Sequence, residues 1–288
     1  MSPSPAISVV IGSTAPTESL EACLAALEPQ VDDTVEVLVE EAAASPAALR
    51  ERFPWARFSS RSATLVPELW RDGIDASSGD IVALTIAPMT PASDWIGQLR
   101  ELHAEFDAVA GAIDPGRGLR PSDWAEYFCR YAREMRPFPE RDTVDLPGDN
   151  AAYKRALLDP VRDLYRDGFW ENVVQHRLAA DGVRLHQSPK LVVFQGRSAG
   201  WKAFASQRLA HGRKYGHQRG EHFSRNRNLA GVVASPAVPF VMTGRVLAQV
   251  FRRRRYRLRA VAVTPIVFSL EAVWALAEAR GHLDMLRK

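Results

Sequence analysis

Cysteine is nearly absent from this sequence, which argues against the protein classes that depend on it. Cys23 and Cys129 are the two cysteines among 288 residues, and neither lies in a CxxC motif or near a histidine. A disulfide framework and a cysteine–histidine zinc site are therefore not expected. The first residues also lack the basic start and the apolar run of a secretory signal. We therefore expect a protein of the reducing cytoplasm.

Two nucleotide-binding motifs are missing as well. The chain contains no GxGxxG and no GxxxxGK[ST] sequence, so the dinucleotide fingerprint and the P-loop are both excluded. Internal repeats and low-complexity segments are also absent. With 46% hydrophobic and 25% charged residues, the chain can bury a large core. The composition indicates one large folded domain, alone or with an appendage.

Positive and negative charges are unevenly distributed along the chain. Residues 202–259 contain 14 Lys or Arg and one acid, Glu221, whereas the first 201 residues contain 20 bases and 30 acids. A basic segment of this kind favours a polyanionic partner such as a membrane surface, a nucleic acid or phosphate groups. A solvated helix rich in arginine is the alternative.

Short apolar runs alternate with segments of helical spacing in the first 90 residues. The β-branched and apolar runs predict strands, and apolar residues three or four positions apart predict helices. The expected elements are strands at 7–11, 35–39 and 81–85 and helices at 18–27 and 66–76. Strands this apolar cannot face water, so we expect an α/β fold with a mostly parallel sheet that helices cover on both sides. Ligands then bind at the carboxyl ends of the strands.

The character of the chain changes near residue 200. Before this point we expect a helix at 170–182 and a strand at 191–194. After it come a basic amphipathic helix at 201–219, an apolar stretch at 232–251, an arginine-rich run at 252–259 and an apolar run at 260–277. We therefore expect two domains, 1–200 and 201–288, of which the second is a helical extension.

The last apolar run, 260–277, is at the lower limit for crossing a bilayer of about 30 Å. It contains Pro265 and Glu271, and a carboxylate at mid-membrane is unfavourable, which argues against a span. Basic residues beside two apolar helices favour helices that lie on an anionic surface, at the inner face of the cell membrane. The alternative is that the helices pack on each other or on a second copy of the chain, as in a homo-oligomer.

Five sequence blocks follow one another in a fixed order between residues 6 and 200. They are Ser8–Leu20, Val35–Glu41, Gly79–Thr85 with Pro91–Trp95, Gly148–Arg155, and Phe169–Asn172 with Arg177 and Gly182. Together they resemble the family 2 glycosyltransferases. The blocks are similar to that family's opening strand and loop, its second strand ending in acids, its third-strand block, its acceptor-side loop and its catalytic-acid helix.

The resemblance implies a GT-A type fold, with a Rossmann-like, mostly parallel mixed sheet flanked by helices. It also implies transfer of a sugar, with inversion, from a nucleoside diphosphate sugar to the hydroxyl of a sugar, a lipid or a small molecule. Family members carry an acidic pair at a helix start and an arginine six residues after the second acid. Counting back from Arg177 gives Glu171, which we expect to be the general base. The alternative is a first-turn acid that the helix dipole favours.

A set of residues at the strand ends and in these blocks is expected to contact the nucleotide and the donor sugar. These residues are Gly12, Ser13, Thr14, Glu40, Arg71, Ala87, Asp149 and Asn150. Glu40 ends the second strand, where a carboxylate can accept hydrogen bonds from a ribose or a base N–H; a solvated strand end is the alternative. Asp149 and Asn150 either bond sugar hydroxyls or only shape a turn.

One block departs from the family pattern. Family members place an acidic metal-binding motif directly after the third strand, whereas this chain has Ile86-Ala87-Pro88, whose side chains cannot ligate Mg²⁺ or Mn²⁺. We therefore expect no metal there. Cationic side chains of the basic helix are the expected replacement at the diphosphate: Arg208, His211, Arg213 and Lys214. Such side chains can hold phosphate oxygens; contact with lipid or solvent is the alternative.

Three functions compete on these observations. The leading hypothesis is an inverting, metal-independent glycosyltransferase at the cytoplasmic membrane face. The second is a catalytically degenerate relative that binds a nucleotide sugar and acts through partners, which the missing acidic motif favours. Nucleic-acid binding ranks last, because the arginine-rich run lies between apolar segments and has few interleaved aromatic residues.

Overall fold

The chain folds into two compact units. The computed structural model describes residues 6–14, 17–61, 65–197, 200–221 and 223–286. Unit 1 comprises residues 1–116 and 134–196 and contains the β-sheet, whereas unit 2 comprises residues 117–133 and 197–288 and is helical. Helix α5 (Pro121–Tyr131) lies inside the expected first domain but belongs to unit 2, because it packs on helix α11 (Arg257–Leu286).

One mixed sheet forms the centre of unit 1. Its strand order is β3-β2-β1-β4-β8-β6-β9-β5, and β7 pairs with β9. The first four strands in this order are parallel to one another, as are β6 and β9, whereas β8, β5 and β7 run antiparallel to their neighbours. The bounds are β1 Ile7–Ser13, β2 Val35–Glu41, β3 Ala56–Ser60, β4 Ile81–Ile86, β5 Met89–Pro91, β6 Ala108–Pro115, β7 Arg141–Asp142, β8 Asn150–Lys154 and β9 Leu185–Gln195. The expected α/β class, with a mixed sheet flanked by helices, is confirmed; parallel pairing predominates among the N-terminal strands, and antiparallel pairing joins β8, β5 and β7 to the sheet.

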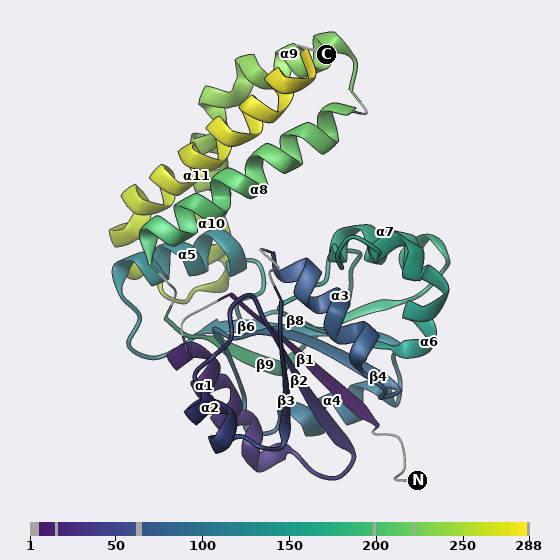
Figure 1. The fold of residues 1–288 in the computed structure, drawn as a ribbon. Helices are drawn as coiled ribbons and strands as arrows, with labels where there is room; N and C mark the ends of the chain where they lie inside the picture. The colour runs from purple at the N-terminus through teal and green to yellow at the C-terminus, as the bar shows by residue number, and fades with distance from the viewer. Residues whose placement is uncertain (1–5, 15–16, 62–64, 198–199, 222, 287–288) are drawn as a thin grey trace. The chain divides into compact units, whose positions relative to one another are not determined.

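Helices cover both faces of this sheet (Figure 1). Helices α3 and α7 lie on one face, and α1 and α4 lie on the other. On β1, Val10 and Gly12 face α3, because a Cβ added at Gly73 of α3 would touch Val10 and one added at Gly12 would touch Trp70 of α3. The bounds of the α-helices are α1 Thr17–Leu27, α2 Ala47–Arg52, α3 Val66–Ala76, α4 Trp95–His103, α6 Arg155–Leu158 and α7 Glu171–Ala180. Two 3₁₀ helices follow α1 and α6: η1 Glu28–Gln30 and η2 Asp159–Tyr165.

The predicted elements of unit 1 are present. The strands expected at 7–11, 35–39, 81–85 and 191–194 are all found, each longer than predicted, and the helix expected at 66–76 has those bounds. The helix expected at 170–182 is α7. Strands β3, β6 and β8 were not predicted, and they complete the sheet on both sides of the three N-terminal strands.

The carboxyl ends of three neighbouring strands meet at one edge of the sheet. Gly12 of β1 is in register with Glu40 of β2 on one side and with Ile86 of β4 on the other. Because these strands are parallel, their carboxyl ends lie together at this edge. The fold therefore brings the expected donor-binding positions of β1, β2 and β4 to one place.

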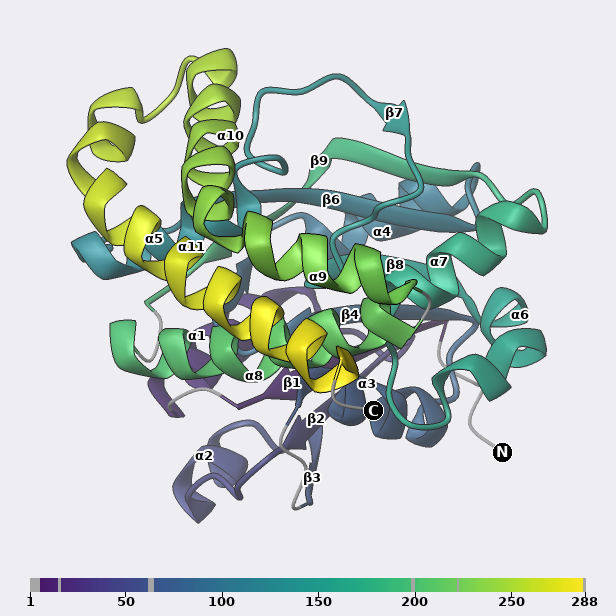
Figure 2. The ribbon, with the colours of Figure 1, turned by 90° about the horizontal axis from the view of Figure 1, so that it is seen from above.

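Unit 2 contains α5, α8 (Trp201–Glu221), α9 (Arg225–Ala234), η3 (Ser235–Ala237), α10 (Val238–Arg253) and α11. Helices α8 and α11 lie side by side (Figure 2). Glycines make this contact close: a Cβ at Gly216 would lie 2.2 Å from the Glu278 carbonyl oxygen, and one at Gly281 would lie 2.4 Å from the Arg213 carbonyl oxygen. The two backbones therefore touch directly, with no side chain between them at these points.

Two helical stretches of unit 2 are long and apolar enough to cross a membrane by length and composition. They are Arg225–Arg253, which includes α9, η3 and α10, and Arg257–Leu286. Within the second stretch, the carboxylate of Glu271 is buried and forms an ion pair with Arg208 of α8 at 2.5 Å. The apolar run at 260–277 thus has its one acid neutralised inside the helical unit.

Candidate functional site

A closely packed glycine lies near the carboxyl end of β1. Gly12 has little room for a side chain, because an added Cβ would lie 3.2 Å from Val66 and 3.4 Å from Trp70 Nε1. The Gly12 carbonyl accepts a hydrogen bond from the Ala87 N–H at 3.1 Å, which joins the end of β1 to the residue that follows β4. Ser13 is buried and Thr14 is exposed. Of these expected residues, Thr14 has the accessible side chain.

Trp70 connects this edge to the expected base, Glu171. The indole is 2% exposed, and its Nε1 donates to the Thr85 carbonyl of β4 at 2.8 Å. A Cβ at Gly148 would lie 3.0 Å from the Trp70 ring and 3.2 Å from the carboxyl carbon of Glu171. Gly12, Trp70, Gly148 and Glu171 are therefore consecutive neighbours on the α3 face of the sheet.

Glu171 is the first residue of α7 and is half-buried. Burial raises the pKa of the Tyr153 phenol on β8, and the negative charge of Glu171 adds to this shift. Arg177, whose spacing identified Glu171, is exposed and pairs with Asp181 at 2.8 Å. The structure thus places Glu171 beside the 146–150 loop, where a carboxylate can meet a ligand held at the sheet edge.

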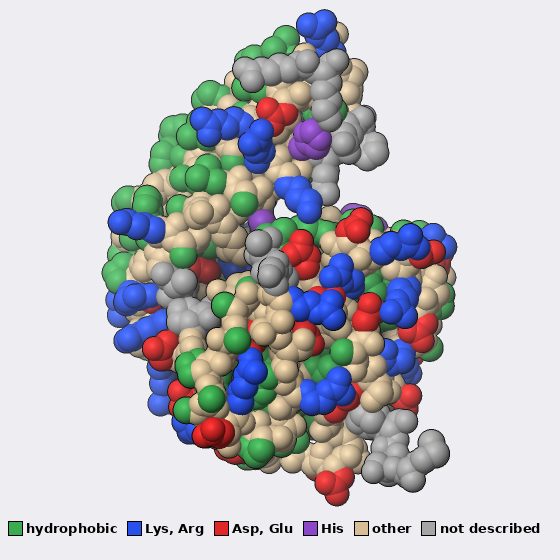
Figure 3. Space-filling model, viewed as in Figure 1, with side chains coloured by type: hydrophobic (Ala, Val, Ile, Leu, Met, Phe, Trp, Pro, Cys, Tyr) green, Lys and Arg blue, Asp and Glu red, His purple; other side chains and the backbone are tan. Residues whose placement is uncertain are grey.

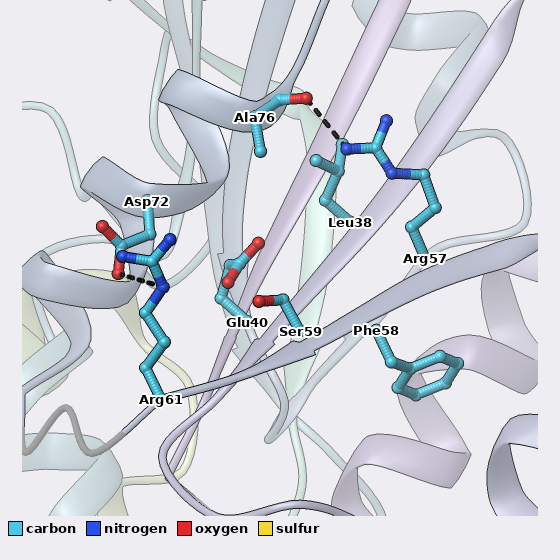
Figure 4. A pocket seen from close by; sticks show the side chains of 8 residues that line it. All are labelled: Leu38, Glu40, Arg57, Phe58, Ser59, Arg61, Asp72 and Ala76. Atoms are coloured by element: carbon cyan, nitrogen blue, oxygen red, sulfur yellow. Dashed lines mark hydrogen bonds and ion pairs between the residues drawn. The ribbon is translucent and has the colours of Figure 1, made fainter.

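Glu40 lines a pocket of about 320 Å³ between α3 and the strands β2 and β3 (Figure 4). The pocket is lined by Leu38, Glu40, Arg57, Phe58, Ser59, Arg61, Asp72 and Ala76. Glu40 is buried, and that burial raises the pKa of its carboxyl; the hydrogen bond with Ser59 opposes the shift, and the charge of Asp72 adds to it. A buried carboxyl at a polar pocket can accept or donate a hydrogen bond to a ligand.

Two arginines flank this pocket. Arg57 donates to the Ala76 carbonyl at 3.0 Å, and Arg61 lies 3.7 Å from the Asp72 carboxylate. Arg71, an expected donor contact, instead bonds Asp72 at 2.7 Å and the Arg166 carbonyl at 2.9 Å. The guanidinium groups at the pocket are therefore those of Arg57 and Arg61.

The expected pair Asp149 and Asn150 is buried at the start of β8. The Asn150 amide accepts from Trp95 Nε1 at 2.9 Å and donates to the carbonyls of Ala112 and Leu191 at 2.9 and 3.0 Å. Both amide protons are thus used to join β8 to β6 and β9. Asn150 performs a structural task here, which is the alternative that the sequence left open, and the backbone carbonyl of Asp149 accepts from the Thr85 hydroxyl.

The turn after β4 does not fit a divalent metal. The side chains of Ile86 and Ala87 are buried and carry no oxygen, and the Pro88 carbonyl accepts from the Gly196 N–H at 2.7 Å. Among the residues that the structure describes, no three His, Cys, Asp or Glu side chains form a group that could hold a metal ion. The donor set expected for Mg²⁺ or Mn²⁺ is therefore not provided at this position.

The four cationic residues expected at the diphosphate all lie on α8, in unit 2. Arg208 bonds the Leu270 carbonyl and the buried Glu271 carboxylate, and Arg213 pairs with Asp284 at 2.8 Å. Burial lowers the pKa of His211, and Lys214 is exposed. Moving Arg208 to a phosphate would leave Glu271 buried without its ion pair, so Arg213 and Lys214 are the better candidates for an anion.

Several residues at the site had not been predicted. Trp70 lies on the buried side of α3, where an aromatic residue is typical of ordinary core. Arg57 and Arg61 belong to β3 and its end, in a segment whose sequence, Ala56-Arg-Phe-Ser-Ser-Arg61, has no strong strand pattern. The one available signal was the positive charge of the two arginines in that segment.

No family model and no curated protein matches this chain. The geometry of unit 1 therefore provides the information about function. That geometry combines a polar pocket between α3 and the strands β2 and β3, a closely packed glycine near the end of β1 and a carboxylate at the start of α7. Such an arrangement can bind a polar ligand along the sheet edge and accept a proton from a group placed beside Glu171.

Proposed function

We propose that unit 1 binds a nucleoside diphosphate sugar and transfers the sugar to a hydroxyl acceptor with inversion. The observation that carries this proposal is the position of Glu171, whose carboxyl carbon lies beside Gly148, which also packs against Trp70, on the sheet face that also holds Gly12 and Glu40. A general base must lie within hydrogen-bond reach of the proton that it removes. A donor bound along this sheet edge would lie beside Glu171.

The nucleoside end of the donor fits the Glu40 pocket. Glu40 and Ser59 supply hydrogen-bonding groups for a base or a ribose, and Arg57 and Arg61 add positive charge. The diphosphate would then extend along the carboxyl ends of β1 and β4.

The reaction proceeds by a single displacement. The acceptor hydroxyl oxygen attacks the anomeric carbon on the face opposite the diphosphate, and the bond from that carbon to the phosphate oxygen breaks. The electron pair of this bond leaves with the nucleoside diphosphate. The hydroxyl proton passes to a carboxylate oxygen of Glu171, which must be ionised beforehand.

A second function, binding without transfer, is favoured by one observation. The turn at Ile86-Ala87-Pro88 supplies no acidic ligand, so a metal would not assist the departure of the diphosphate there. A protein of this kind would hold the nucleotide sugar in the same cleft and act through partners. The two functions differ in whether the donor is consumed.

A donor panel separates these functions. Release of nucleoside diphosphate is measured for the full chain with a set of nucleotide sugars and hydroxyl acceptors, with and without EDTA. We expect Glu171→Gln to lower turnover about 10²- to 10⁴-fold while donor binding, measured by calorimetry, is retained. The matched control is Glu18→Gln, which changes an exposed first-turn acid of α1. Equal turnover by Glu171→Gln and the wild type would overturn the proposal, and binding without turnover in the wild type would favour the second function.

Two glycines allow a steric test of the same site. Gly148→Ala places a methyl group 3.0 Å from Trp70 and 3.2 Å from the Glu171 carboxyl carbon, so the carboxylate must move and turnover should fall. The expected loss of stability is about 1–3 kcal/mol. Gly97→Ala is the control, because an added Cβ meets nothing within 4 Å and α4 should gain about 0.5–1 kcal/mol. Urea unfolding and donor turnover, measured on both variants, check the prediction.

A further inference from the structure

Helices α9 and α10 carry an apolar surface that the chain itself does not cover. Residues 228–244 contain no charged side chain, and 17% of the most apolar window of Arg225–Arg253 is buried. A core helix of a water-soluble domain would be mostly buried instead. Val233 is 72% exposed and Phe240 is 68% exposed. The exposed apolar residues of this surface are Leu229, Ala230, Val233, Ala234, Pro236, Ala237, Phe240, Val241, Ala248 and Phe251.

The start of α11 continues this pattern. Leu258 is 88% exposed, and Val261 is also exposed. Phe240 of α10 stacks edge-on against Phe268 of α11 at 4.9 Å between ring centroids, so the two helices share one aromatic contact. Figure 3 shows hydrophobic side chains interleaved with Lys and Arg on the surface of the helices of unit 2. We call the exposed apolar residues of α9, α10 and the start of α11 the apolar face.

Exposed arginines accompany the apolar face along the sequence. Arg225 and Arg227 precede it, and Arg245, Arg252, Arg254, Arg257 and Arg259 lie among its residues from α10 to the start of α11. No Asp or Glu occurs between residues 222 and 270. A surface that combines exposed apolar side chains with a single sign of charge is complementary to an anionic bilayer, because arginine stems reach the headgroups while apolar groups enter the acyl region.

We propose that the apolar face inserts into the surface layer of an anionic lipid bilayer, with α9 and α10 lying along the membrane plane. At 1.5 Å per residue, the 10 residues of α9 and the 16 residues of α10 measure about 15 and 24 Å. Each is shorter than the roughly 30 Å hydrocarbon layer. The break at η3, which contains Pro236, separates the two helices. These lengths fit a helix pair that lies on the membrane.

A second copy of the chain fits this face less well. A symmetric dimer contact brings the same residues of two chains together. Here it would place the arginine clusters of both copies beside each other with no acid from residues 222–270 to neutralise them. Anionic lipid removes this repulsion, since each basic residue near such a surface favours binding by roughly fivefold.

Vesicle flotation with the full chain tests the proposal. The probes are vesicles of phosphatidylcholine alone and of phosphatidylcholine mixed with phosphatidylglycerol. We expect binding to the anionic vesicles, weakened by salt. Arg252→Gln with Arg259→Gln should weaken it about 25-fold, and Val233→Ser with Phe240→Ser should weaken it about tenfold or more.

Exposed residues of unit 1 provide matched controls. Val144→Ser with Leu164→Ser changes two exposed apolar side chains, and Arg52→Gln with Arg166→Gln changes two exposed arginines. Both controls should bind vesicles as the wild type does. Circular dichroism confirms that each variant is folded, and an environment-sensitive dye on Phe240→Cys should shift to the blue on anionic vesicles.

Three results would overturn the proposal. The protein could float with neither kind of vesicle, or the control variants could lose as much vesicle binding as the variants of the apolar face. The third result is a protein that binds no vesicles and forms a dimer that dissociates in the variant Val233→Ser with Phe240→Ser. The last result would assign the apolar face to a second copy. None of these measurements requires a sugar donor, so they test the membrane surface independently of glycosyl transfer.

Discussion

Two glutamates on the same face of β2 have pKa values that move in opposite directions. Burial raises the pKa of Glu40. Burial also opposes ionisation of Glu36, but hydrogen bonds from Ser8, Ser78 and Gly79 outweigh it and lower the pKa of that carboxyl. The folded protein therefore disfavours the charge on Glu40 and favours the charge on Glu36.

These shifts predict opposite pH dependences of stability. Because the folded-state pKa of Glu40 is raised, its contribution is present below the unfolded value of about 4.3 and is lost as the pH rises through the folded value. The free energy of unfolding of Glu40→Gln should therefore increase relative to that of the wild type as the pH rises above about 4.3. Glu36 contributes above about 4.3, so Glu36→Gln should be less stable than the wild type at neutral pH and approach it on acidification. Urea unfolding across this range measures both; parallel curves for the two variants would contradict the prediction.

Single residues at the site were predictable where position along a strand determines their place. Glu40 ends a strand that is visible in the sequence, and parallel pairing brings it beside Gly12. Asn150 could not be assigned, because its amide partners Trp95, Ala112 and Leu191 are distant in sequence. A Gly-Asp-Asn sequence is compatible with a ligand site and with a buried structural amide, and local pattern does not distinguish them.

The buried ion pair between α8 and α11 leads to a prediction at the scale of elements. Glu271→Leu removes the partner of Arg208 and should lower the free energy of unfolding by about 3–5 kcal/mol. The double variant Arg208→Leu with Glu271→Leu should recover most of this loss, because no uncompensated charge stays buried. The exposed pair Arg166–Asp163 is the control, and Asp163→Leu should cost less than about 1 kcal/mol. Chemical unfolding monitored by circular dichroism measures these values, and a double variant as unstable as Glu271→Leu would count against the argument.

Elements were predictable in proportion to the strength of their periodicity. Helix α3 has apolar residues on one side, Pro67 near its start and Ser77 at its end, and its predicted bounds are correct. Strand β6 is rich in alanine and contains Gly111, so it lacks the β-branched run that marks a strand. Gly111 is required there, since a Cβ would lie 1.9 Å from the Leu191 carbonyl oxygen of β9. At that position close packing against β9, and not a side chain with a high β-propensity, stabilises β6.

The division into two units predicts two separate responses to ligands. A nucleoside diphosphate should slow amide hydrogen exchange at the ends of β1 and β2 and in the 146–150 loop, and leave α9 and α10 unchanged. Anionic vesicles should slow exchange in α9 and α10 and leave the sheet edge unchanged. Mass spectrometry of peptides resolves these regions. Protection of α9 and α10 by the nucleotide alone would contradict this assignment of the two ligands.

At the scale of the whole molecule, the distribution of charge along the sequence predicts where the second unit lies. The order of the elements along the chain does not predict which helices pack together. The excess of bases after residue 202 coincides with most of unit 2, so composition alone indicates where the second unit lies. The membership of α5 in unit 2 is not visible in the sequence, because it results from packing on α11, more than a hundred residues away along the chain. The local spacing of apolar residues does not predict such a contact.

The glycine contact between α8 and α11 has a consequence for the surroundings that unit 2 can tolerate. Helices joined backbone to backbone at Gly216 and Gly281 adhere through dispersion forces, which do not require the release of water from apolar side chains. A helix pair held in this way keeps its geometry in an apolar environment as well as in water. Helices α8 and α11 can therefore act as a rigid support in either environment.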